Sequence, residues 1–213
     1  MRNFATRIRL ARIVVLMLPF AAFGQQTANG QFNSQANVQN AVTYNERGIA
    51  KQHKGDLDGA MADYNHAIQL NPKYSAAYDN RGDIKRKKGD LDSAMADLNH
   101  AIQLNPKNPH AYNNRARAKE MKGDLDGAMA DFNEAIRLNP KYAHAYNNRG
   151  TAKERKGDLN GALADYNRAI QLDPKYATAY KDRGNAKRKK GDINGANTDL
   201  NQAIKLGSNL STL

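Results

Sequence analysis

The sequence predicts an all-α solenoid made of five helix-turn-helix repeats of 34 residues. The main evidence is the stretch 55–60, Gly-Asp-Leu-Asp-Gly-Ala, which returns four more times, little changed, at a constant offset of 34 residues. The later copies begin at Gly89, Gly123, Gly157 and Gly191, with no insertion or deletion between them. Self-similarity at a fixed period of this length is typical of stacked units, none of which can bury its apolar face alone.

The first 24 residues differ from the repeats and predict a secretory signal peptide of bacterial type. Four arginines precede an apolar run over 13–23, and small residues follow up to Gly24, a pattern typical of cleavage after that residue. The alternative is a retained membrane anchor. A spanning helix needs about 20 apolar residues, and this run has eleven residues with Pro19 among them. We therefore expect cleavage and a periplasmic or secreted protein that keeps no transmembrane segment.

Residues 25–40 carry no charge and are rich in Gln, Asn, Ser and Ala. Such a segment has too little apolar surface to offset the entropy lost on ordering, so we predict a flexible leader. The repeats follow over 41–210, and a short tail, 211–213, ends the chain. The five repeats are 41–74, 75–108, 109–142, 143–176 and 177–210.

Each repeat carries signals for two helices. In the first repeat, a helix near 42–54 should end at Gly55, because glycine readily takes the left-handed conformation that closes helices. The second helix should end before Pro72, since proline disfavours helix in the residue that precedes it. Aspartate and asparagine side chains are favourable N-caps. The predicted caps of the second helices are Asp58, Asp92, Asp126, Asn160 and Asn194.

Aligned columns of large and small residues resemble the tetratricopeptide repeat (TPR). The aromatic column is Tyr44, Tyr78, Tyr112, Tyr146 and Tyr180, and the small-residue column is Gly48, Gly82, Ala116, Gly150 and Gly184. Two alanine columns of the second helix begin at Ala60 and Ala67 and recur in every repeat. The resemblance covers residues 41–210 and implies a right-handed superhelical solenoid. It also implies a concave groove, lined by the first helices, that binds a protein or peptide.

Two columns depart from the family pattern, with arginine in place of leucine and lysine in place of tyrosine. Charges near a core must be paired and hydrogen-bonded, and an aspartate recurs in every repeat to supply the partner. We therefore predict a structural Arg–Asp ladder without a catalytic role. Its members are Arg47, Arg81, Arg115, Arg149, Arg183, Asp63, Asp97, Asp131, Asp165 and Asp199, with the lysine column Lys51, Lys85, Lys119, Lys153 and Lys187 beside it.

The exposed stripe of the first helices should line the concave groove, and its residues vary from repeat to repeat while the packing columns do not. Side-by-side asparagines there are suited to a peptide backbone, because an amide both donates and accepts hydrogen bonds. The alternative is a solvated face without a ligand. The candidate peptide-binding residues are Asn80, Asn113, Asn114, Arg117, Asn147, Asn148 and Arg155.

The charge of the chain favours acidic partners. The formal net charge is +12, and loss of the four signal-peptide arginines leaves +8. A basic surface attracts acidic proteins, anionic membranes or nucleic acid. Nucleic acid is the weakest of these, since no exposed aromatic ladder accompanies the charges. The densest lysine runs also complement the helix dipole at helix ends, so a structural role without any partner also accounts for them.

No catalytic, metal or cofactor site is predicted. The five histidines stand in no metal-ligand motif, cysteine is absent, and no phosphate loop or nucleophile elbow occurs. Two function classes remain: a non-catalytic binding scaffold that acts outside the cytoplasm, and a structural envelope protein whose solenoid ends stack. We expect a monomer, because Asn197 and Thr198 place polar atoms where earlier repeats carry apolar residues.

Overall fold

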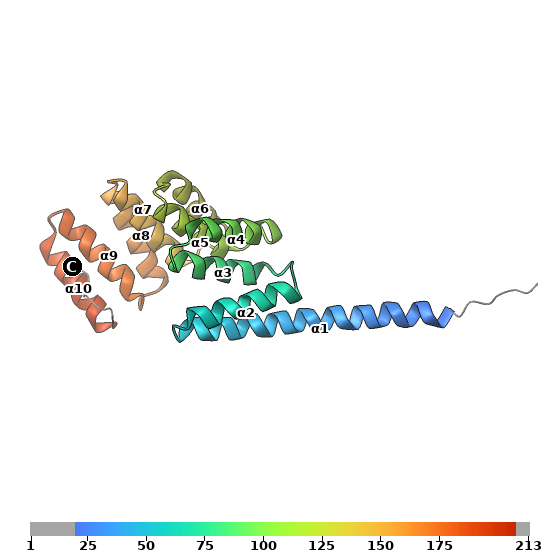
Figure 1. The fold of residues 1–213 in the computed structure, drawn as a ribbon. Helices are drawn as coiled ribbons and strands as arrows, with labels where there is room; N and C mark the ends of the chain where they lie inside the picture. Colours follow the sequence, from blue (N-terminus) through green and yellow to red (C-terminus); the bar gives the residue numbers. More distant parts are fainter. Residues whose placement is uncertain (1–19, 208–213) are drawn as a thin grey trace, which may run out of the picture. The chain divides into compact units, whose positions relative to one another are not determined.

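The computed structural model describes the backbone of residues 20–207 and the side chains of residues 35–207 (Figure 1). Most of the predicted signal peptide, 1–24, lies outside the described residues, and so does the tail, 211–213. Among the helices that the structure describes, none has the length and apolar character needed to cross a membrane.

Within residues 20–207 every regular element is an α-helix, and the predicted all-α solenoid of helix-turn-helix repeats is confirmed. Four of the first helices begin at the first residue of a predicted repeat. The helices are α1 (Phe20–His53), α2 (Leu57–Leu70), α3 (Ser75–Lys87), α4 (Leu91–Leu104), α5 (Pro109–Met121), α6 (Leu125–Leu138), α7 (Ala143–Arg155), α8 (Leu159–Leu172), α9 (Ala177–Lys189) and α10 (Ile193–Lys205).

The first helix begins earlier than expected. Contacts divide the chain into two units, residues 1–37 and 38–213, and the repeats belong to the second. Because α1 starts at Phe20, the segment 25–40 is helical rather than the flexible leader that we predicted. Extending an existing helix costs far less than nucleating one. The packed start of the repeats near Ala41 can serve as the nucleus, and no proline interrupts the segment.

The residues that cap the second helices also differ from the prediction. The N-cap of α2 is Asp56, whose Oδ1 accepts from the Gly59 backbone N–H at 2.8 Å, so Asp58 already lies in the first turn. Gly55 takes a φ of +83° in the turn, as predicted, and the cap lies two residues before the one that we predicted. The same holds in the other repeats, whose caps are Asp90, Asp124, Asp158 and Asp192.

The residues predicted as caps serve a different purpose. Asp58, Asp92 and Asp126 pair with Lys88, Lys122 and Lys156 of the following repeat. In the fourth repeat Asn160 accepts a hydrogen bond from Lys190 at 2.6 Å. These pairs are exposed, and exposed ion pairs contribute about 0–1 kcal/mol each.

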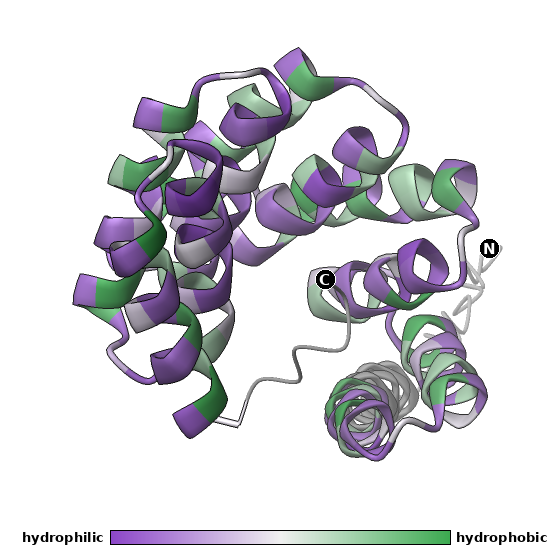
Figure 2. Cartoon of the chain, turned by 90° about the vertical axis from the view of Figure 1, so that its left-hand side faces the viewer, coloured by the Kyte–Doolittle hydropathy of each residue, from purple (hydrophilic) through white to green (hydrophobic). Residues whose placement is uncertain are grey.

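Small residues let the two helices of a repeat approach closely. A Cβ added at Gly150 would lie 2.7 Å from Cε1 of Tyr166, and one at Gly82 would lie 2.8 Å from Cγ of Leu98. Tyr166 and Leu98 are fully buried between layers. Hydrophobic and hydrophilic residues alternate along the helices of the repeats (Figure 2).

The first helices form the inner side of the array. Within residues 57–205, α3 contacts α5, α5 contacts α7 and α7 contacts α9, whereas no such contact joins α4, α6, α8 and α10 to one another. Helices that touch from repeat to repeat lie on the inside of a curve. The concave face is therefore built by the first helices of the repeats, as expected for the groove.

Candidate functional site

The Arg–Asp ladder is present in all five repeats. Each arginine donates from Nε and Nη2 to both carboxylate oxygens of the aspartate sixteen residues later, at 2.6–2.8 Å. In each repeat the lysine of the lysine column also contacts the aspartate, with its Nζ 2.7–2.9 Å from a carboxylate oxygen. The aspartates are buried. At one of them the Arg47 guanidinium holds the pKa of Asp63 at about 2.

The ladder also joins neighbouring repeats, which we did not predict from the sequence. From the second repeat on, Nη1 of each arginine donates to an asparagine of the preceding repeat at 2.7–2.9 Å. These asparagines recur in every repeat, which is the signal that could have revealed them. The acceptors are Asn65, Asn99, Asn133 and Asn167. Because every ladder carboxylate is fully engaged, we assign this ladder a structural role.

A second set of polar contacts crosses the concave face, and we call it the amide row. Asn80 donates to Asn45 at 2.9 Å, Asn114 to Asp79 at 2.8 Å, and Asn148 to Asn113 at 2.9 Å. Each bond links one repeat to the next. Its members are Asn45, Asp79, Asn113 and Asn147, which are buried, and Asn80, Asn114, Asn148 and Asp182, which are partly exposed. The predicted groove asparagines are therefore bonded to one another as well as lining the face.

The amide row reverses its direction between the fourth and fifth repeats. Asp182 stands where the second, third and fourth repeats have asparagine, and a carboxylate cannot donate. Asn147 therefore donates forward, from Nδ2 to Oδ2 of Asp182 at 2.8 Å. Burial raises the pKa of Asp182, which the hydrogen bond from Asn147 opposes. As a result Oδ1 of Asn147, a residue 2% exposed, has no hydrogen-bond partner among the described residues.

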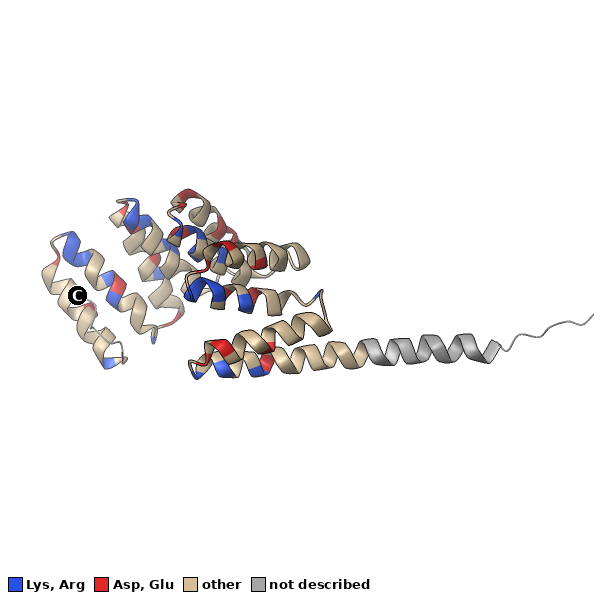
Figure 3. Cartoon of the chain, viewed as in Figure 1, with Lys and Arg blue, Asp and Glu red and all other residues tan. Residues whose placement is uncertain are grey.

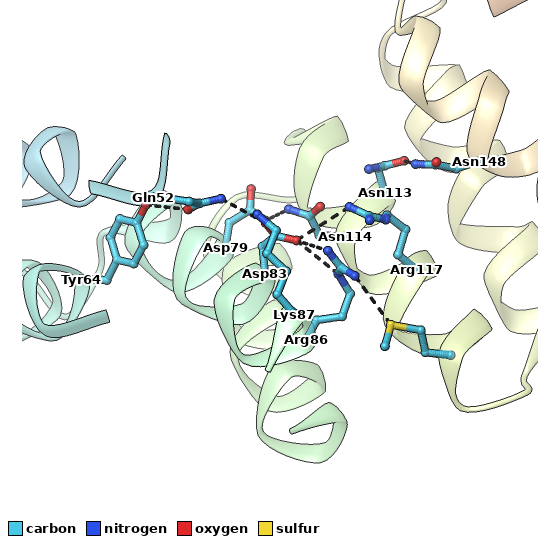
Figure 4. Close-up of polar contacts among 11 residues, drawn as sticks. Gln52, Tyr64, Asp79, Asp83, Arg86, Lys87, Asn113, Asn114, Arg117 and Asn148 are labelled. Carbon is cyan, nitrogen blue, oxygen red and sulfur yellow. Dashed lines mark hydrogen bonds and ion pairs between the residues drawn. The ribbon is translucent and has the colours of Figure 1, made fainter. Parts of the chain in front are cut away.

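A cluster of charges lies beside the amide row on α3 and α5 (Figure 4). The buried carboxylate of Asp83 accepts from Arg86 at 2.7 Å and pairs with Lys87 at 2.7 Å. It also accepts from Gln52 of the preceding repeat at 3.3 Å. Nη1 of Arg117 is 3.9 Å from the same carboxylate. One carboxylate thus faces three cations, and the cluster carries excess positive charge.

The centre of the concave face holds a cavity of about 500 Å³, which we call the central cavity. Its lining comes from three repeats and includes all the predicted groove residues of α5 and α7 except Arg155: Asn113, Asn114, Arg117, Asn147 and Asn148. Asp182 and Thr178 of α9 complete one end of the lining. The central cavity therefore brings a guanidinium, several amides and a carboxylate together.

The rings of Tyr142, His144 and Tyr176 line the central cavity. The ring centroids of His110 and Tyr142 are 4.7 Å apart, and those of His144 and Tyr176 are 4.4 Å apart. Burial raises the pKa of Tyr176 to about 12 and lowers the pKa of His144, so both rings are neutral at pH 7. His110 and His144 belong to the stripe that we expected to line the groove, whereas we did not single out the two tyrosines. Tyr142 and Tyr176 precede the first helices, outside the helical stripe that we considered.

Two predicted groove residues lie outside the central cavity. Asn80 is part of the amide row nearer the N-terminus. Arg155 pairs with Oε1 of Glu120 at 3.0 Å and lines a neighbouring cavity of about 420 Å³ with Glu154, Arg188 and Lys189. Thr151 and Asp182 line both cavities.

The charges along the first helices are mixed, with Lys and Arg concentrated in the last turns of α3 and α9 (Figure 3). Among the described residues, no group of three or more His, Asp and Glu side chains is arranged to hold a metal ion. The amides, hydroxyls, guanidinium and carboxylate that line the central cavity can form hydrogen bonds and charge pairs.

The chain matches two family models described as tetratricopeptide repeats. The model "Tetratricopeptide repeat" matches residues 41–74, and the model "TPR repeat" matches residues 82–123, 121–157 and 152–187. Together these matches cover well over half of the 213 residues. The chain therefore belongs to the tetratricopeptide repeat family.

Solved structures share this fold. A crystal structure of MamA is 26% identical, with 75% of this chain and 93% of MamA covered and a TM-score of 0.60. TTC0263, described as a thermophilic TPR protein in Thermus thermophilus, is 19% identical, with coverage of 78% and 91% and a TM-score of 0.72. YrrB, described as a TPR protein with an unusual peptide-binding site, is 20% identical, with coverage of 83% and 91% and a TM-score of 0.57. No curated protein matches the chain.

Proposed function

We propose that the protein is a non-catalytic scaffold that binds an extended peptide segment of a partner protein along its concave face. The observation that carries this proposal is the central cavity, which spans three repeats and is lined by amide, hydroxyl and guanidinium groups. A peptide backbone presents both donors and acceptors, and asparagine amides can meet both. The similarity to YrrB is a similarity of fold, and the proposal rests on this chain's own residues.

The place of action is also a proposal. The basic start, short apolar run and small residues of 1–24 favour export, so we propose that the scaffold works in the periplasm or after secretion. Its formal charge of +12, or +8 without the signal-peptide arginines, favours an acidic partner through long-range attraction.

A bulky substitution inside the central cavity tests the proposed groove. Peptides are first selected from a displayed random library of 12-residue peptides, and their dissociation constants are then measured by fluorescence polarisation. Thr178→Trp is expected to weaken binding at least about tenfold, or 1.4 kcal/mol, because Thr178 lines the cavity and is exposed. It makes no ladder contact, so thermal stability should change little.

The matched control is Ala130→Trp, at an exposed position on α6 that lines none of the cavities described above. Its effect on binding should stay within about twofold, as for other surface substitutions away from a site. A failure to select any peptide, or equal losses in the two tryptophan variants, would count against binding in the groove.

Stacking of solenoid ends is the competing function, and one observation favours it. Ile193 and Ile204 of the last helix are 53% and 50% exposed, where a sixth repeat would otherwise pack. Asn197 and Thr198 are exposed on the same helix and add polar atoms to its surface. Leu210 and Leu213, which follow this helix in the sequence, lie outside the described residues.

We propose that the protein is a monomer, and sedimentation velocity over a wide concentration range tests it. The expected result is a single species of monomer mass at every concentration, since scattered exposed apolar residues do not by themselves form an interface. A dimer that persists on dilution, and that Ile204→Lys disrupts, would instead support end-to-end association.

A further inference from the structure

Asn147 is unusual within the amide row. Where the buried residue and its partner in the next repeat are both asparagine, the carbonyl of the buried residue accepts the hydrogen bond. Asn45 accepts from Asn80 in this way, and Asn113 accepts from Asn148. Because Asp182 interrupts the pattern, the carbonyl of Asn147 is left unpaired although it is buried. An unsatisfied buried carbonyl lowers stability, so a native chain that keeps one invites a functional explanation.

The position of this carbonyl points to a ligand donor. Asn147 lines the central cavity, which is large enough to admit a peptide segment. The nearby carboxylate of Asp182 already accepts from Asn147 and cannot donate while ionised. The Oδ1 atom exposes less than 1 Å², so an N–H group entering the cavity would restore the missing hydrogen bond by displacing the atoms that cover it.

Arg117, which also lines the central cavity, needs an acceptor, whereas the carbonyl of Asn147 needs a donor. Its side chain is 38% exposed, and the carboxylate nearest to it, that of Asp83, lies 3.9 Å away and is already bonded to Arg86 and Lys87. Burial first, and then the neighbouring Arg86, lower the pKa of Arg117, and the charges of Asp83 and Glu120 only partly oppose this. A second carboxylate beside Arg117 would balance the cluster, and guanidinium groups bind carboxylates with two parallel hydrogen bonds.

We propose that the central cavity recognises an acidic peptide segment, whose Asp or Glu side chain pairs with Arg117 while a backbone N–H donates to Oδ1 of Asn147. This inference rests on the proposed function and adds the chemistry of its ligand. The carboxylate belongs to a side chain because the polar surface continues on both sides of the site, through Asn114 to Asp79 of α3 and through Asp182 into the neighbouring cavity. The carboxylate of Asp182 disfavours a second acidic residue at that end, so the site also sets the order of charges along the peptide.

The test uses selected library peptides with acetylated N-termini and amidated C-termini, so that side chains supply the only carboxylates. Changing the key Glu or Asp of the peptide to Gln or Asn is expected to weaken binding to the wild-type protein at least about tenfold. The same change should weaken binding to Arg117→Gln by less than about twofold, since the partner charge is already absent. This part of the test alters the peptide, so it does not depend on the stability of a variant.

Asp182→Asn provides the second arm. An asparagine at position 182 can donate to Asn147, as Asn148 donates to Asn113, and this satisfies the orphan carbonyl from within the protein. The variant is expected to unfold at a higher temperature than the wild type and yet to bind the peptide at least about threefold more weakly, because the acceptor is already hydrogen-bonded within the protein. A merely structural role for Asp182 would not raise stability and lower affinity together.

The outcomes separate the two proposals. Peptides that lose binding with Thr178→Trp but are indifferent to loss of their acidic residue, or to Arg117→Gln, would overturn the acidic-peptide site and leave the groove intact. Binding that requires a free C-terminal carboxylate would likewise overturn it, as would an Asp182→Asn variant that binds as tightly as the wild type. Peptides insensitive to Thr178→Trp would overturn the proposed function itself.

Discussion

Phe132→Ala is expected to lower the free energy of unfolding by about 3–5 kcal/mol, the usual cost of deleting a buried aromatic ring. Phe132 is fully buried and packs against Ala116 of α5, Ala128 of α6 and Ala152 of α7. The ring therefore packs α6 against α5 within the third repeat and against α7 of the fourth repeat. Alanine would leave a cavity lined by small residues that cannot move in to fill it.

Phe132→Leu is the matched control, because Leu98 and Leu200 occupy the same column in the second and fifth repeats. Leucine keeps most of the volume and should cost less than about 1.5 kcal/mol. Both variants can be compared by denaturant unfolding of the purified protein. A loss of less than about 1 kcal/mol in Phe132→Ala would contradict the packing described between these repeats.

Asp131→Ala is expected to cost about 3–5 kcal/mol, because breaking a buried ion pair leaves its partners uncompensated. Arg115 and Lys119 both contact Asp131 at 2.7–2.8 Å, and their side chains are only about one-fifth exposed, at 19% and 20%. Without the carboxylate the two cations, which lie one turn apart on α5, would be left close together without their counter-ion. The same denaturant experiment measures the effect.

Asp126→Ala is the control for this ladder position. Asp126 lies in the same repeat and pairs with Lys156, but its side chain is 88% exposed. Exposed pairs contribute about 0–1 kcal/mol, so the expected loss is several times smaller than for Asp131→Ala. Equal losses would mean that the ladder is no more important than the surface pairs between repeats.

Repetition made much of the fold and the ladder predictable from the sequence. The arginine and aspartate columns recur at one fixed spacing in all five repeats, and a charge in each core layer requires a partner. The glycine after each first helix likewise marked a helix end, and Gly55 and its counterparts do take positive φ. The cap was misassigned because Asp56 and Asp58 flank Leu57 and both are chemically suited to the task.

The central cavity was less accessible to sequence reasoning. The paired residues of the amide row are 35 residues apart, which is one repeat plus one residue. The two partners therefore belong to different columns of the aligned repeats, and a search for residues that recur every 34 positions does not pair them. The reversal at Asn147 depends on a single change, Asp182 in place of asparagine, whose effect appears only when the two side chains face each other. Tyr142 and Tyr176 enter the lining from the turns between repeats, where no helical period applies.

The most direct test of the peptide-binding groove is NMR titration of the isotope-labelled protein with a library-selected peptide. We expect the largest shift changes at Arg117, at the side-chain amides of Asn147 and Asn148, and along the inner faces of α5, α7 and α9, because these surround the central cavity. Changes confined to the second helices α4, α6 and α8, or to the exposed end of α10, would contradict the proposal that the concave face is the working surface.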